Sequence, residues 1–297
     1  MSAAEADVLE GGPSTSSRPA PRAGRALPLR FLRSELSIIF GRRRNVALLG
    51  VLAAIPVLLA VAIKLSSDGD QGGGGPGFFE AITSNGLFVA FAALAAELPL
   101  FLPLAVAAAS GDAIAGEANQ GTLRYLLTIP AGRTRLLLTK YVAVVLFGLV
   151  ATALVAVAGV VAGLALFGGG DVILLSGTTT SLLDGVGRLA LSVLYLAACL
   201  AALGAIGMFV STLTEQPIAA IVATIGVNVL MFILDQIPQI AWLHPFLLVD
   251  HWTAFGDLLR DPMSTDAIGQ GLLVALAYAA VFMTAAWARF ASKDITS

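Results

Sequence analysis

The chain has 297 residues, of which 58% are hydrophobic and only 12% are charged, and its mean hydropathy is +0.90. A soluble domain carries roughly 25% charged residues, so this composition excludes an ordinary water-soluble globular protein. The formal net charge of -2 adds nothing to the assignment, and we expect no nucleic acid as a partner. The composition predicts an all-α, polytopic membrane protein.

The first 44 residues divide into two parts. Residues 1–27 are rich in Ser, Pro, Gly, Ala and Arg and lack the apolar core of a signal peptide, which predicts a disordered cytoplasmic tail. In residues 28–44, apolar side chains recur at helical spacing, with Arg30, Arg33 and Ser37 on the opposite face. The apolar positions are Leu29, Leu32, Leu36, Ile39 and Phe40. This pattern favours an amphipathic helix in the cytoplasmic interface, near anionic lipid headgroups, over an N-terminal extension of the first span.

Six apolar runs approach the length of about 20 residues that a membrane-spanning helix needs. They are Asn45 to Lys64, Leu87 to Ser110, Leu136 to Phe167, Arg188 to Ser211, Pro217 to Leu234 and Gly269 to Ala288. We therefore predict a six-helix transmembrane domain over residues 45–290, followed by a short cytoplasmic tail at 291–297. Gly159 and Gly163 in the third run form a small-xxx-small pattern, which we assign to helix packing within the chain.

Orientation follows from the basic residues, because cytoplasmic flanks carry the excess of Lys and Arg. With six spans both termini share one side. If that side is the cytoplasm, only Lys64, Arg188 and Arg260 of the 17 basic residues fall outside it. We therefore predict a multi-pass protein of the plasma membrane with both termini in the cytoplasm.

The predicted external segment 235–268 is too apolar for a freely solvated loop, and we expect short re-entrant or interfacial helices with Trp242 and Trp252 at the membrane interface. His244, Asp250 and His251 lie in it, but their spacing is weak evidence for a metal, and we interpret them as interfacial polar residues. The single cysteine excludes a disulfide framework or a cysteine metal cluster within the chain.

The cytoplasmic segment between the second and third spans, residues 111–135, is the most patterned polar stretch. Thr122 is placed to cap a short helix, Leu123, Leu126 and Leu127 then share one side, and Pro130 ends it. Arg133, Arg135 and Lys140 follow as basic anchors at the base of the next span. The pattern predicts a small apolar knob suited to docking, although the same residues are compatible with a simple turn whose leucines lie against the membrane.

This segment resembles the first cytoplasmic loop of the membrane subunits of type 2 ABC exporters, which reads E-x-x-x-G-T-L-x-x-L-L-x-x-P-x-x-R. The matching residues are Glu117, Gly121, Thr122, Leu123, Leu126, Leu127, Pro130 and Arg133. The six-span plan, the basic interfacial helix, the apolar loop before the last span and the terminal Lys293, Asp294 and Ile295 extend the resemblance over residues 28–297. In that family the segment forms a coupling helix that sits in a cleft of a separate ATPase subunit.

The resemblance implies a permease subunit of a type 2 ABC exporter that moves an amphipathic, lipid-like or drug-like molecule outward. It also implies two ATPase subunits and a second permease subunit, which is another copy of this chain or a relative. The chain has no Gly-x-x-x-x-Gly-Lys-[Ser/Thr] sequence for phosphate binding. ATP and Mg²⁺ are therefore expected on the partner, and we predict no catalytic, cofactor or metal site in this chain.

Glu97 lies inside the second predicted span, where an ionisable group is costly enough to be a candidate for function. In one interpretation it lies along the translocation path or at an interface, where it contacts a cationic substrate or binds a proton. In the other it is a protonated side chain that forms a hydrogen bond to a neighbouring helix. Asn228 in the fifth span either joins helices or lines the path. A proton-coupled secondary transporter that uses Glu97 is one alternative function, and an intramembrane enzyme is another, but both His residues fall outside the spans.

Overall fold

The computed structural model describes residues 27–69, 85–121, 132–174 and 176–292. Its helices are α1 (Leu27–Gly41), α2 (Arg43–Gly69), α4 (Leu87–Glu97), α5 (Phe101–Asn119), α7 (Arg133–Phe167), α8 (Leu182–Leu213), α9 (Pro217–Asp235) and α10 (Asp266–Ser292), with 3-10 helices η1 (Pro238–Phe246) and η2 (Asp250–Leu259). Strands β1 (Val172–Ile173) and β2 (Thr179–Thr180) form a small antiparallel hairpin. Apart from this hairpin the described structure is helical, as predicted.

Five helices, α2, α7, α8, α9 and α10, are each long and apolar enough to cross a membrane, and α4 with α5 makes a sixth span if the pair is one broken helix. The helices extend past the predicted apolar runs, since α7 begins at Arg133, α8 begins at Leu182 and α10 continues to Ser292. Apart from the ends of α1 and α10, the predicted tails at 1–27 and 291–297 lie outside the described residues.

The second span departs from the prediction of one continuous helix. α4 ends at Glu97, α5 begins at Phe101, and their axes are bent by 58°. The cause is a pair of prolines: Pro99 and Pro103 have no N–H, so the carbonyls of Ala95 and Pro99 lose their donors four residues ahead. Hydropathy alone does not detect this break, because the residues around it are apolar.

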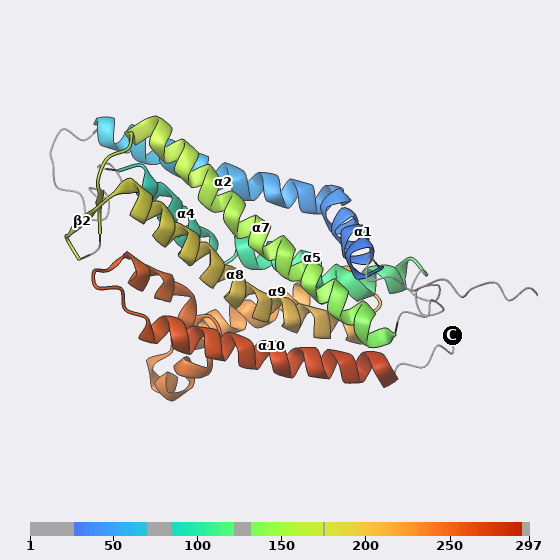
Figure 1. The fold of residues 1–297 in the computed structure, drawn as a ribbon. Coiled ribbons are helices and arrows are strands. Elements are labelled where there is room, and N and C mark those ends of the chain that lie inside the picture. The colour runs from blue at the N-terminus through green and yellow to red at the C-terminus, as the bar shows by residue number, and fades with distance from the viewer. Residues whose placement is uncertain (1–26, 70–84, 122–131, 175, 293–297) are drawn as a thin grey trace, which may run out of the picture.

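The helices run back and forth between two ends of the bundle (Figure 1). One end, which we call the α1 end, holds α1, the last turns of α5, the start of α7 and the last turn of α10. The opposite end, the hairpin end, holds the β1–β2 hairpin, the last turns of α2 and the first turns of α8 and α10 (Figure 1). The first described helix, α1, and the last turn of α10 therefore lie at the same end of the bundle.

The centre of the bundle is α8, which packs against α5, α7, α9 and α10. Of its most apolar stretch 72% is buried, against 17% for α9 and for α10, so those two helices expose most of their apolar surface. α8 begins at a Ser181 cap, whose hydroxyl accepts a hydrogen bond from the Asp184 N–H at 3.2 Å.

α7 packs closely on α4 through the predicted small-xxx-small pair. A Cβ on Gly159 would meet the backbone of Ala90, and a Cβ on Gly163 would meet the Gly86 carbonyl. These glycines therefore allow two backbones to touch, which confirms their role in packing within the chain.

The segment 235–268 forms η1 and η2, so the expected short helices are present as 3-10 helices. Trp242 is 72% exposed, but Trp252 is 1% exposed and packs edge-on against Phe232, with ring centroids 5.7 Å apart. The prediction that Trp252 lies at the interface was therefore wrong, because η2 packs its apolar face onto α8 and α10. Arg188 holds η2 in place by donating to the Leu258 and Arg260 carbonyls at 2.8 Å.

Candidate functional site

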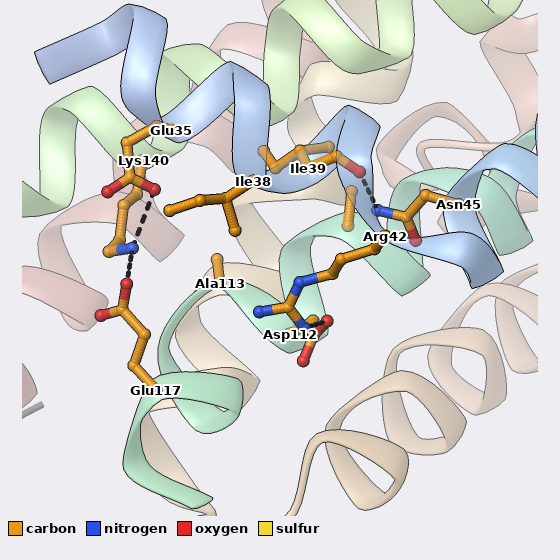
Figure 2. Close-up of a pocket in the computed structure, with 10 residues that line it drawn as sticks. Glu35, Ile38, Ile39, Arg42, Asn45, Asp112, Ala113, Glu117 and Lys140 are labelled. Carbon is orange, nitrogen blue, oxygen red and sulfur yellow. Dashed lines mark hydrogen bonds and ion pairs between the residues drawn. The ribbon is translucent and has the colours of Figure 1, made fainter. Parts of the chain in front are cut away.

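Six charged side chains gather at the α1 end, on four different helices. They are Glu35 of α1, Arg42 at the α1–α2 junction, Arg44 of α2, Asp112 and Glu117 of α5 and Lys140 of α7. We call this set the α1 ion-pair cluster. Figure 2 shows two groups of interacting side chains, one around Lys140 and one around Asp112, with Ile38 and Ala113 between them.

The first group centres on Lys140. Its Nζ lies 2.9 Å from Glu35 Oε2 and also pairs with Glu117 Oε1. The side chains of Lys140, Glu35 and Glu117 are only 4%, 7% and 13% exposed. Charged groups buried to this degree need a partner of opposite charge. Lys140 supplies the positive charge that allows the two acids to be buried together.

The second group centres on Asp112, which is buried. Its Oδ2 accepts from Arg42 and, at 3.0 Å, from Arg44, whose guanidinium also donates to the Ala108 carbonyl at 3.0 Å. Burial lowers the pKa of Arg42, while the nearby Glu117 and Glu35 act in the opposite direction. An arginine keeps its proton in proteins, so the group carries two positive charges and one negative charge.

The net charges of the two groups cancel. The Lys140 group has one cation and two acids, and the Asp112 group has two cations and one acid, so the whole cluster is neutral. Arg42 connects them, because it binds Asp112 directly and is attracted to Glu117 and Glu35. The cluster therefore behaves as one network that fastens α1 and the start of α2 to α5 and α7.

Two further side chains shape the cluster. Asn45, which is buried, donates from Nδ2 to the Ile39 carbonyl at 2.9 Å and so satisfies a backbone group at the break between α1 and α2. Ser211 of α8 inserts into α5, because its hydroxyl donates to the Gly111 carbonyl at 2.7 Å and accepts from the Ala115 N–H at 2.9 Å. This bridge positions the turns of α5 that carry Asp112 and Glu117.

The predicted coupling residues fall partly on this cluster. Glu117 belongs to it, and its side chain faces Lys140 rather than solvent. Gly121, two residues after the end of α5, has a φ of +68°, a left-handed conformation that explains glycine at this position of the pattern. Thr122, Leu123, Leu126, Leu127 and Pro130 lie outside the described residues.

Arg133, which lies near the other end of the predicted coupling segment, is the first residue of α7. Its guanidinium donates to the Ala291 carbonyl at 2.7 Å, and the Trp287 indole N–H donates to Thr134 Oγ1 at 2.9 Å. These contacts tie the start of α7 to the end of α10. The segment therefore leaves one helix and enters the next at points that are both attached to other helices.

The two predicted path residues lie elsewhere, at the break between α4 and α5. Glu97 is fully buried, and Asn228 of α9 donates from Nδ2 to the Pro99 carbonyl at 3.2 Å. Asn228 thus links α9 to the break between α4 and α5. The histidines of the 235–268 segment bond to backbone carbonyls of Ile237 and Pro245, and no cluster of metal-ligating residues occurs in the described ranges.

Sequence reasoning missed most of the ion-pair cluster. It identified Glu117 through the motif and Lys140 only as a basic anchor, and it gave no role to Glu35, Asp112 or Ser211. A usable signal was present in Glu35, which is the single acid in an otherwise basic amphipathic stretch. An acid on a predicted interfacial helix requires a cation on a neighbouring helix when it is buried.

The comparisons with known proteins give a family and no activity. A search of curated proteins returns no match to this chain. The family model DUF2705, described as a protein of unknown function, matches residues 57–296. The match contains Asp112, Glu117 and Lys140 and excludes α1 and the first turns of α2. Because it covers most of the sequence, the chain belongs to the DUF2705 family.

Proposed function

We propose that this chain is the permease subunit of an ATP-driven ABC exporter, and that the segment from Glu117 to Arg133 couples it to a separate ATPase subunit. The match of that segment to the coupling-loop pattern of type 2 ABC exporters carries the proposal. The anchors at both ends support it, since Glu117 pairs with Lys140 and Arg133 bonds to Ala291. A loop that transmits motion requires such anchors, because a freely hinged loop would move without moving the spans.

Motion of the segment would reach several helices through the α1 ion-pair cluster. Glu117 lies on α5, Lys140 on α7 and Glu35 on α1, so a displacement of the segment is passed to all three. The Asp112 group extends the connection to the start of α2. We infer that the α1 end moves as a unit when the partner ATPase opens and closes.

The chain itself is then non-catalytic, and ATP and Mg²⁺ are bound by two copies of the partner ATPase. A second permease subunit, identical or related, completes the translocation path. The substrate class that fits a path lined by apolar spans is amphipathic, lipid-like or drug-like. The location that follows is the plasma membrane, with the coupling segment and both termini in the cytoplasm.

The test is purification of the tagged full-length protein from its native membrane in mild detergent, with gentle crosslinking, followed by mass spectrometry. An ABC ATPase at equal ratio supports the proposal. Leu126→Asp should remove that partner, whereas Thr179→Asp, an exposed hairpin residue at the opposite end, should retain it. Clean protein without any ATPase after crosslinking contradicts the proposal.

A transport assay separates this function from a proton-coupled secondary transporter. ATP depletion should abolish transport by an ABC exporter. Transport that survives ATP depletion and collapses with the proton gradient favours the secondary transporter instead.

A further inference from the structure

The break between α4 and α5 contains buried oxygen atoms that lack hydrogen-bond donors. Glu97, the last residue of α4, is 0% exposed, and neither of its carboxylate oxygens has a hydrogen-bond partner among the described residues. Asn228 is 1% exposed, and its Oδ1 is likewise without a partner in the described ranges. Buried polar atoms are paired in the great majority of cases, so two such side chains at one break require an explanation.

The backbone adds to this surplus of acceptors. Pro103 has no N–H for the Pro99 carbonyl, and the Asn228 amide group supplies the missing donor at 3.2 Å. Pro99 in turn has no N–H for the Ala95 carbonyl. Donating from Nδ2 to Pro99 turns the amide so that Oδ1 remains available as an acceptor. The break between α4 and α5 therefore carries the unpartnered carboxylate of Glu97 and, two residues further along the chain, the Pro99 carbonyl that holds Asn228 with its unpartnered amide oxygen.

No described cation balances Glu97. None of the ion pairs among the described residues includes it. The helices packed on α4 and α5 carry their charged residues within roughly two turns of a helix end. These residues are Arg43, Arg44, Lys64 and Asp68 of α2, Arg133, Arg135 and Lys140 of α7, Asp184 and Arg188 of α8, and Asp235 of α9, besides Asp112 and Glu117 of α5 itself.

The other titratable groups on these helices are tyrosine hydroxyls, which already donate hydrogen bonds to backbone carbonyls, and one buried thiol. The Tyr141 hydroxyl donates to the Ala201 carbonyl at 3.1 Å and the Tyr195 hydroxyl to the His251 carbonyl at 2.6 Å, while Cys199 is fully buried. An isolated carboxylate is not stable in such surroundings, so a positive charge must accompany it.

We propose that Glu97 and Asn228, at the α4–α5 break, form an intramembrane site for one exchangeable monovalent cation, either a proton on Glu97 or a sodium ion held by the carboxylate and amide oxygens. Broken helices place carbonyl oxygens where a small cation needs them. The site is distinct from the α1 ion-pair cluster. It concerns a small cation and does not depend on the proposed export function, and its test needs no ATPase.

The first experiment labels the wild-type protein with dicyclohexylcarbodiimide, which couples to protonated carboxyl groups in apolar surroundings. The peptide that contains Glu97 is quantified by mass spectrometry from about pH 6 to about pH 9, in NaCl or in choline chloride at equal ionic strength. For a proton site, labelling falls by about tenfold per pH unit once Glu97 deprotonates, equally in both salts. For a sodium site, NaCl slows labelling several-fold at fixed pH, and choline does not.

The second experiment follows thermal unfolding of the purified full-length protein under the same conditions. The wild-type midpoint should rise with acid or with NaCl, and Glu97→Gln should lose that response, whereas Glu215→Gln, at an exposed carboxylate between α8 and α9, should keep it. Asn228→Leu should lose the sodium response and retain the proton response. Glu97 labelling that is absent, or that ignores both pH and sodium, overturns the proposal, as does a Glu97→Gln variant that responds like the wild type.

Discussion

Replacing Lys140 with methionine tests the α1 ion-pair cluster most sharply. The substitution keeps the apolar stem and removes the charge that lies 2.9 Å from Glu35 and pairs with Glu117. The two acids, 7% and 13% exposed, are then left facing each other without that cation. Removing one partner of a buried ion pair costs about 3–5 kcal/mol, and we expect Lys140→Met to lower the free energy of unfolding by that amount.

The charge can be separated from the packing by a second variant. A double substitution of Lys140→Met and Glu35→Gln removes one cation and one acid with little change in volume and keeps Glu117 near Arg42, so the cluster stays neutral. It should recover most of the loss, because neutral replacements of a buried ion pair are close to neutral in stability. Arg135→Gln is the matched control, since Arg135 is an exposed basic residue on the same helix and should change stability by less than about 0.5 kcal/mol.

The assay is reversible unfolding in mixed detergent micelles, followed by tryptophan fluorescence. A Lys140→Met variant within about 1 kcal/mol of the wild type would refute the claim that the cluster stabilises the α1 end, because a buried unpaired acid costs more than that. A double variant no more stable than the single one would refute the electrostatic explanation of the loss.

Two further substitutions test how the spans are held. Ser211→Ala should lower the unfolding free energy by about 1–3 kcal/mol, because it removes the bridge between the Gly111 carbonyl and the Ala115 N–H; an unchanged value would show that α5 closes this bond by itself. Gly163→Ala should cost about 1–3 kcal/mol, because its Cβ would meet the backbone of Gly86, the residue that precedes α4. Gly226→Ala, with nothing within 4 Å of its Cβ, should be neutral or stabilising by up to about 1 kcal/mol, and equal effects of the two glycine variants would contradict the close packing of α7 on α4.

The elements that follow from local patterns were predictable from the sequence. Apolar runs placed the spans, the stripe from Leu29 to Phe40 placed α1, and Gly159 and Gly163 identified a close helix contact. Each of these signals depends on residues within one helix. The break after Glu97 was not predicted, because hydropathy measures transfer to lipid and ignores the missing N–H groups of Pro99 and Pro103.

The ion-pair cluster was not predictable for a different reason. Glu35 and Lys140 are 105 residues apart, and Arg42 and Asp112 are 70 apart, so no spacing rule connects them. Their association depends on which helices become neighbours, which a single sequence does not give. The motif located Glu117, and the structure shows that its side chain pairs with Lys140 inside the bundle.

Site-specific photocrosslinking is the sharpest test of the proposal that the segment after Glu117 binds an ATPase. A photoreactive amino acid is placed at Leu126 of the full-length chain in its native cells, and at Thr179 on the hairpin at the opposite end as the control. The probe at Leu126 should capture an ABC ATPase, and the probe at Thr179 should not. Absence of an ATPase adduct at Leu126, with the chain inserted at its normal level, would contradict the proposed coupling role of this segment.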